Sequence, residues 1–177
     1  GADVRTAALI TNMDSPLGSA VGNSLEVIES VEILKGKTSG DLWTVCRELS
    51  CRMLMLAGIG DKDECGRLVD EAVESGEALK RFEMMVKLQG GDVSYIEDTS
   101  KFRKASFSRE VYAPADGYIT HMDSEKIGLT AVLLGAGREK KDDDINHAAG
   151  IIIAAKTGDF VKRGELLATL LADDESR

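Results

Sequence analysis

Apolar residues at helical spacing, repeatedly interrupted by glycine, constrain the fold of this 177-residue chain more than any other feature. They predict helices that begin near residues 41, 61 and 77 and end at glycines around residues 58–60, 76 and 90. Because the loops between them are short, neighbouring helices are expected to run antiparallel. An earlier helix is expected to start at Ser15 and Pro16 and to end at Gly36. Before it, the apolar residues 6–11 predict a buried strand, giving a strand–turn–helix unit of an α/β layer.

The second half of the chain has a β pattern. Residues 110–113 and 118–122 are expected to form strands around a turn at residues 114–117, and residues 150–155 and 166–171 two further strands. Residues 127–134 are expected to form a short helix or turn, followed by a charged loop at residues 138–144. Between the two halves, Lys101, Arg103 and Lys104 lie among small polar residues without a clear period. We interpret residues 93–108 as a linker, with a phosphate contact as the alternative.

Charge and composition exclude several classes of function. The chain has 22 basic and 31 acidic residues, and this net charge of −9 argues against a nucleic-acid binder and against docking on an anionic membrane. Apolar runs such as residues 151–155 are far too short to span a bilayer, and no basic-then-apolar leader is visible. The three cysteines show no CxxC spacing and are expected to be reduced, as in a cytoplasmic protein. The methionines at positions 53, 55, 84 and 85 are expected to fill the core.

Three short motifs are weak signals of binding. Gly135-x-Gly137 lacks the third glycine of a dinucleotide fingerprint, so nucleotide binding is not expected there. The acidic run at residues 142–144 lacks the spaced ligands of a calcium loop and is interpreted as solvated. Residues 113–119 and 158–167 resemble the two halves of a biotinyl/lipoyl-type barrel-sandwich module. Because no lysine follows Gly164 where that family carries its modified residue, a swinging-arm role is not expected.

Four segments together carry a more specific signal. The longest is Ile10-Thr11-Asn12-Met13 followed by Pro16-Leu17-Gly18-x-Ala20-Val21-Gly22-Asn23-x-Leu25-Glu26-Val27-x-Glu29. Gln89-Gly90-Gly91-Asp92, Ala115-Asp116-Gly117 and Leu134-Gly135-Ala136-Gly137-Arg138 follow it in the chain. In this order, the segments resemble the pyrimidine-nucleoside phosphorylase and thymidine phosphorylase family. The resemblance covers residues 5–172.

The resemblance implies a pentosyltransferase of pyrimidine nucleoside salvage. Such an enzyme exchanges the base of thymidine or uridine for phosphate, giving deoxyribose or ribose 1-phosphate, and requires no cofactor. The family binds phosphate and nucleoside through KxSTGGxGD, RDxT, SxxxSKK and DVKxGxGAF segments, none of which occurs in this sequence. We therefore expect a C-terminal fragment that has no catalytic or cofactor-binding residues and is inactive alone. The alternative is a stand-alone, non-catalytic binding module with the biotinyl/lipoyl-like fold.

The resemblance also implies a fold class and a division into domains. The expected class is α/β (α+β), with residues 1–92 as the C-terminal part of a helix-rich α/β phosphorylase domain. Residues 93–108 are the linker, residues 109–172 a barrel-sandwich-like domain and residues 173–177 a polar tail. The family forms homodimers through a helical domain that has no counterpart in this sequence. We therefore expect this chain to be a monomer or to associate in a non-native way.

One cation site follows from the resemblance. Family members hold a potassium-like ion near the phosphate loop, and the matching positions here are Leu17 and Ala20, through main-chain carbonyls, and Glu29, through its carboxylate. Ligation by oxygen alone suits a hard cation. Because the phosphate loop would supply the remaining ligands, weak or empty occupancy is expected in this chain. The alternative is that Glu29 simply faces solvent.

Overall fold

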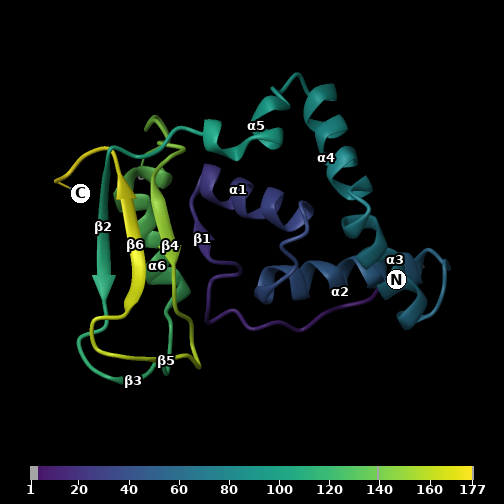
Figure 1. The fold of residues 1–177 in the computed structure, drawn as a ribbon, viewed down its shortest axis with the longest axis horizontal. Helices are drawn as coiled ribbons and strands as arrows, with labels where there is room; N and C mark the ends of the chain where they lie inside the picture. The colour runs from purple at the N-terminus through teal and green to yellow at the C-terminus, as the bar shows by residue number, and fades with distance from the viewer. Residues whose placement is uncertain (1–3, 139, 177) are drawn as a thin grey trace. The chain divides into compact units, whose positions relative to one another are not determined.

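The computed structural model describes residues 4–138 and 140–176. Glu139 of the predicted charged loop, Arg177 of the predicted tail and residues 1–3 lie outside this part. Helices dominate the first half and strands the second, which confirms the predicted α/β class (Figure 1). The helical elements are α1 (Asn23–Leu34), α2 (Gly40–Leu56), α3 (Lys62–Glu74), α4 (Glu77–Leu88), α5 (Ser94–Glu97), η1 (Thr99–Lys101), α6 (Ser124–Ala131) and η2 (Val132–Ala136). The strands are β1 (Ala20–Val21), β2 (Phe107–Tyr112), β3 (Gly117–Tyr118), β4 (Gly150–Ile153), β5 (Phe160–Val161) and β6 (Leu166–Ala172).

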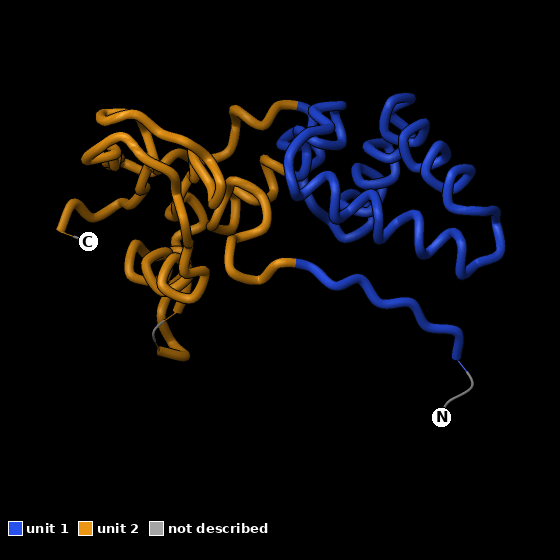
Figure 2. The backbone as a smooth tube through the Cα atoms, turned by 90° about the horizontal axis from the view of Figure 1, so that it is seen from below, with its two compact units in different colours: residues 1–11, 30–97 blue, residues 12–29, 98–177 orange. Residues whose placement is uncertain are grey.

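The chain forms two compact units (Figure 2). Unit 1 comprises Gly1–Thr11 and Ser30–Glu97, and unit 2 comprises Asn12–Glu29 and Asp98–Arg177. Helix α1 therefore contributes its first residues to unit 2 and its last residues to unit 1. The predicted domain boundaries at residues 92/93 and 108/109 stay a prediction. The predicted linker contains the short helical elements α5 and η1.

Unit 2 is built on a four-stranded antiparallel sheet of order β1-β4-β6-β2. Strand β4 lies between β1 and β6, with Ile153 opposite Ala168 of β6. Strand β2 pairs with the other side of β6, with Phe107 opposite Ala172. Strand β4 has the sequence Gly-Ile-Ile-Ile, and its β-branched side chains suit a central, buried strand. Every residue of the edge strand β2 is exposed.

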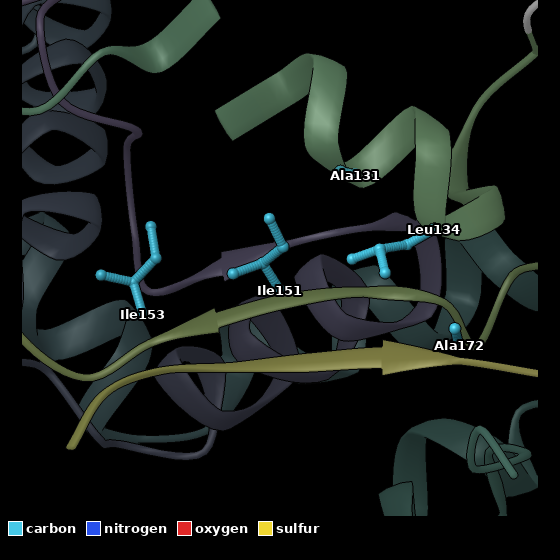
Figure 3. Packing of buried hydrophobic residues seen from close by; sticks show 5 residues of the cluster. All are labelled: Ala131, Leu134, Ile151, Ile153 and Ala172. Carbon is cyan, nitrogen blue, oxygen red and sulfur yellow. The ribbon is translucent and has the colours of Figure 1, made fainter. Parts of the chain in front are cut away.

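A closed apolar core lies between this sheet and the helical segment α6–η2 (Figure 3). Ala131 and Leu134 come from the helical segment, Ile151 and Ile153 from β4, and Ala172 from β6. Each of these side chains is at most 6% exposed. Because side chains alternate along a strand, positions 151 and 153 point to the same face of the sheet. This face is the one that the helical segment covers.

A smaller antiparallel pair, β3 with β5, completes unit 2. Tyr118 lies opposite Phe160, and their rings meet edge to face at a centroid distance of 5.1 Å. Ala113, Ala155 and Val161 form a second cluster of buried apolar residues. Unit 2 therefore has two apolar clusters, each assembled from segments distant in sequence.

The helices of unit 1 end where glycine was predicted to end them. Gly58, Gly76 and Gly90 follow α2, α3 and α4 with φ angles of 78°, 76° and 81°. These are left-handed conformations in which a side chain is disfavoured, so glycine is the residue that ends each helix. Asp61 caps α3, because its Oδ1 accepts the main-chain N–H of Glu64 at 2.9 Å.

The described part of unit 1 has no closed core like that of unit 2. Among its described residues, the buried apolar side chains are Val31, Cys51, Cys65, Val73 and Ile96, and both clusters of buried apolar residues in the described chain lie in unit 2. Helix α4 has no buried residue at all. The apolar faces of these helices are therefore only partly covered within the unit.

Two local predictions are wrong. Residues 6–11 form neither strand nor helix, and Ile10 is 98% exposed. A strand needs a neighbour to pair its N–H and C=O groups, and no strand of the described chain pairs with these residues. Helix α1 starts at Asn23 and not at Ser15, because Gly18 and Gly22 adopt positive φ angles of 75° and 146° and the chain forms β1 between them.

The predicted role of the methionines in the core is also wrong at three positions. Met53, Met84 and Met85 are 62%, 50% and 46% exposed. Their helical spacing correctly predicted α2 and α4. The described part of unit 1, however, does not cover these side chains. No helix among residues 4–138 and 140–176 is long and apolar enough to cross a membrane.

Candidate functional site

The predicted cation ligands gather at the loop before β1, within unit 2. Glu29 lies in the middle of α1, and its side chain reaches back to this loop. One carboxylate oxygen accepts the main-chain N–H of Ser19 at 2.7 Å, and the other accepts that of Ala20 at 3.1 Å. The carboxylate is therefore anchored on the main chain, and the structure brings two of the three predicted residues, Ala20 and Glu29, into direct contact.

Gly18 allows this close approach. It has a φ of +75°, and a Cβ atom at this position would lie 2.5 Å from Oε2 of Glu29. The backbone conformation therefore favours glycine, and a side chain at this position would displace the Glu29 carboxylate. Leu17, the third predicted ligand, immediately precedes Gly18 and has a half-exposed side chain. The carboxylate thus lies against the main chain of a segment that Leu17 begins.

Contacts from the β4–β5 connection hold this loop in place. The Lys156 ammonium donates to the main-chain carbonyl of Pro16 at 2.9 Å. The hydroxyls of Ser15 and Thr157 lie 3.3 Å apart, within hydrogen-bond distance. The main-chain N–H of Ile153 donates to the carbonyl of Ser19 at 2.7 Å. The loop is therefore fixed from the sheet as well as from α1.

The Gly135-x-Gly137 motif helps to fix the start of α1. Asn23 Nδ2 donates to the carbonyl of Ala136 at 2.8 Å, and the main-chain N–H of Asn146 donates to the carbonyl of Gly135 at 2.9 Å. Gly135 has a φ of 105° and so bends the chain at the end of η2. In these contacts the motif presents carbonyl acceptors, whereas a phosphate cradle presents N–H donors. They give the motif a structural role.

The loop offers the oxygen ligands that a hard cation prefers. A carboxylate has about four acceptor positions, so Glu29 keeps capacity beyond the two N–H groups that it binds. The carbonyls of Leu17 and Ala20 are the further predicted ligands, and carboxylate and carbonyl oxygens are the ligand types that a hard cation such as potassium prefers. No group of three or more His, Cys, Asp and Glu side chains in the described part could hold a metal ion. A cation at this loop would thus depend on main-chain oxygens.

A second polar cluster, which the sequence did not indicate, surrounds Asp173. Its carboxylate accepts the main-chain N–H of Ser106 at 2.8 Å, the Ser106 hydroxyl at 3.0 Å and Asn146 Nδ2 at 2.8 Å, and it forms an ion pair with Arg103 at 2.5 Å. The N–H of Ser106, and then the Arg103 guanidinium, lower the pKa of Asp173 to about 2. Arg103 is therefore paired with Asp173, although its side chain stays largely exposed, and the interpretation of this region as a linker stays a prediction.

The register of the sheet explains this cluster. Because Phe107 and Ala172 are paired at the ends of β2 and β6, the next residues outward, Ser106 and Asp173, fall opposite each other. An acid directly after one strand and a serine directly before its partner are a usable signal once the pairing is known. The sequence alone does not give that pairing.

Comparison with known proteins connects the chain to one group of enzymes. Residues 118–177 match the family model of the pyrimidine nucleoside phosphorylase C-terminal domain. The chain is similar to the pyrimidine-nucleoside phosphorylases. This confirms the family resemblance carried by the four sequence segments, and it places the similarity in the C-terminal portion of the phosphorylases.

Three curated relatives show how far the similarity extends. The chain is 40% identical to the pyrimidine-nucleoside phosphorylase of Bacillus subtilis (strain 168) over 97% of its own length and 40% of that protein. The corresponding values for the Geobacillus stearothermophilus phosphorylase are 37%, 97% and 40%. For the Staphylococcus aureus (strain USA300) phosphorylase they are 40%, 93% and 38%. The chain therefore spans about 40% of the length of these relatives.

Proposed function

We propose that this chain is the C-terminal part of a pyrimidine-nucleoside phosphorylase. The complete enzyme would transfer the pentosyl group of a pyrimidine nucleoside to phosphate, giving the free base and ribose or deoxyribose 1-phosphate. The observation that carries the proposal is the similarity of 97% of the chain to phosphorylases of that name. We further propose that the chain alone is catalytically inactive.

The chemistry of the reaction supports this second statement. Displacing a pyrimidine anion from an oxocarbenium-like carbon requires groups that bind phosphate and stabilise the charge developing on the base. The phosphate-binding and base-binding segments expected for the family are absent from the sequence. The polar clusters around Glu29 and Asp173 are occupied with main-chain and side-chain contacts of their own. They support a structural role and supply no nucleophile or general acid.

Phosphorolysis of thymidine and uridine, followed by ultraviolet absorbance, tests the proposal. The B. subtilis phosphorylase serves as the positive control. We expect no turnover from this chain alone. A rate in the ordinary enzyme range, about 1–10³ s⁻¹, would show that the chain carries a complete active site and would contradict the proposed inactivity. A stand-alone binding module would also show no turnover, but it would not support turnover together with the rest of a phosphorylase.

We also propose that Leu17, Ala20 and Glu29 contribute to a monovalent cation site in the complete enzyme. The support is the anchored carboxylate of Glu29 beside a loop whose conformation at Gly18 favours glycine. In activity reconstituted with the rest of a phosphorylase, replacing potassium by choline should lower the rate. Glu29→Gln should remove this dependence, whereas Glu26→Gln should keep it, because Glu26 binds the N–H of Gly22 instead. An equal rate in potassium and in choline would contradict the proposed cation site.

Two further properties belong to the same proposal. The three free thiols suit a reducing compartment, which supports a cytoplasmic location. We propose that the chain by itself is a monomer or associates non-specifically, because the incompletely covered helices of unit 1 expose apolar side chains. Light scattering that shows a defined homodimer of this chain would contradict the second statement.

A further inference from the structure

An apolar groove of about 660 Å³ runs between the helices of unit 1. It opens to solvent, and side chains from α1, α2, α3 and α4 line it. Trp43, Met53, Leu68 and Phe82 are among its large lining residues, and the described chain exposes Met53 by 62% and Leu68 by 39%. The groove is thus the place where the uncovered faces of the four helices meet.

We propose that this groove binds an apolar surface of the part of the phosphorylase that precedes the matched region in the relatives. The inference rests on the proposed function and names a partner surface for it. The length of the relatives supports this occupant, because this chain corresponds to about 40% of their polypeptide and to their C-terminal portion. The matched region therefore leaves more than half of such an enzyme available to cover the groove.

The chemistry of the lining favours protein packing over a small molecule. A ligand pocket combines an apolar wall with a few polar groups that orient the ligand. Here the lining side chains with polar groups are Ser30, Trp43, Cys46 and Ser50, and none of the lining residues is charged. Such a wall recognises apolar shape and has little to orient a polar ligand.

Residues 6–11, also in unit 1, supply independent support. Their sequence Thr-Ala-Ala-Leu-Ile-Thr has the composition of a buried strand, but Ile10 is 98% exposed and no described strand pairs with the segment. A continuous apolar run of this kind is typical of strands that are covered on both faces. The described residues of unit 1 therefore supply no partner for a strand and only partial cover for the helices, and the preceding part of a phosphorylase would explain both deficits together.

The test measures binding between this full chain and the part of the B. subtilis phosphorylase that precedes the matched region, prepared by co-expression. Trp43 is the only tryptophan of this chain and lines the groove, so its emission should shift to the blue when the partner covers it. The groove variants are Met53→Glu and Leu68→Glu. The control is Leu88→Glu, at a position that is 81% exposed and outside the groove lining.

We expect both groove variants to weaken the complex at least about tenfold, because an unpaired carboxylate is costly to bury. The control variant should bind like the original chain. Far-UV circular dichroism of the free variants checks that the helices persist, as the partly exposed positions should allow. Absence of a complex, or equal binding by the groove and control variants, would overturn the proposal.

Two other occupants are outcomes of the same experiment. A homodimer of this chain that the groove variants dissolve would overturn the proposal in favour of a second copy. A small apolar compound that fills the groove and is not displaced by the partner would overturn it as well. Activity separates this inference from the proposed function. A complex that forms through the groove but has no activity would support the proposed docking and contradict the proposed enzyme function. Activity that the groove variants leave unchanged would support the enzyme function and contradict the docking.

Discussion

Unit 1 and unit 2 differ in how completely each covers its own apolar surface. In unit 2, α6 and η2 lie against the sheet, and residues at most 6% exposed form the shared core. In unit 1, side chains from four helices line an open groove. The difference teaches that helical periodicity establishes which face is meant to be buried, but not whether the same stretch of chain supplies the cover.

The largest expected effect tests whether the core of unit 2 is packed more tightly than the groove of unit 1. Leu134→Ala in the core of unit 2 should destabilise that unit by about 2–5 kcal/mol, because it leaves a cavity among packed side chains. Met53→Ala in the groove should cost less than about 1 kcal/mol, since its side chain is already 62% exposed. Urea unfolding followed by circular dichroism measures both. Equal costs would mean that the groove is as well packed as the core, and the comparison between the units would fail.

The next effect concerns the glycines of unit 2. Gly18→Ala should destabilise the unit by about 1–3 kcal/mol, because φ is positive and the new Cβ would press on the Glu29 carboxylate. Gly158→Ala is the matched control, with a φ of +99° and open space around its Cβ position. Thermal unfolding should show a smaller loss for the control. If the two variants lose the same stability, the contact with Glu29 contributes nothing.

A pH effect should follow from Asp173. Its folded pKa, about 2, lies below its unfolded value of roughly 4, so the carboxylate stabilises the fold above that unfolded value. This contribution should be lost as the pH falls from about 4 to about 2. Urea midpoints measured across this range should fall more steeply for the original chain than for Asp173→Asn. Parallel curves would show that the cluster at the end of the sheet does not depend on this charge.

The smallest effect lies in unit 1. Arg47 donates from Nε and Nη2 to the two carboxylate oxygens of Asp70, and so joins α2 to α3. Both side chains are about one-third exposed, so solvent screens the pair, and a double-mutant cycle with alanine should give a coupling of about 0.2–1 kcal/mol. A much larger value would mean that unit 1 depends on polar contacts where unit 2 depends on packing.

The sequence predicted local structure well where the cause is local. Asp61 and the glycines at positions 58, 76 and 90 mark helix ends through contacts within a few residues, and these ends were found. The sequence also identified the segment at residues 17–29, but only through family resemblance. The bend at Gly18 became clear only when the structure placed the Glu29 carboxylate beside it.

Prediction failed where the partner is distant or outside the described chain. Residues 6–11 have the pattern of a strand without a described neighbour, and Met53 has the pattern of a core residue without a cover. The Asp173 cluster depends on the pairing of β2 with β6, which joins residues more than fifty positions apart. In each case the side chain type was informative, but the contact depends on tertiary structure.

Hydrogen exchange measured by mass spectrometry tests the central claim most directly. In this chain alone, amides of α2, α3 and α4 should exchange faster than those of β4 and β6, because few buried contacts protect the helices of unit 1. Adding the preceding part of the B. subtilis phosphorylase should slow exchange in the three helices and leave β4 and β6 unchanged. Helices that are already as protected as the sheet, or that gain no protection from the partner, would contradict the account.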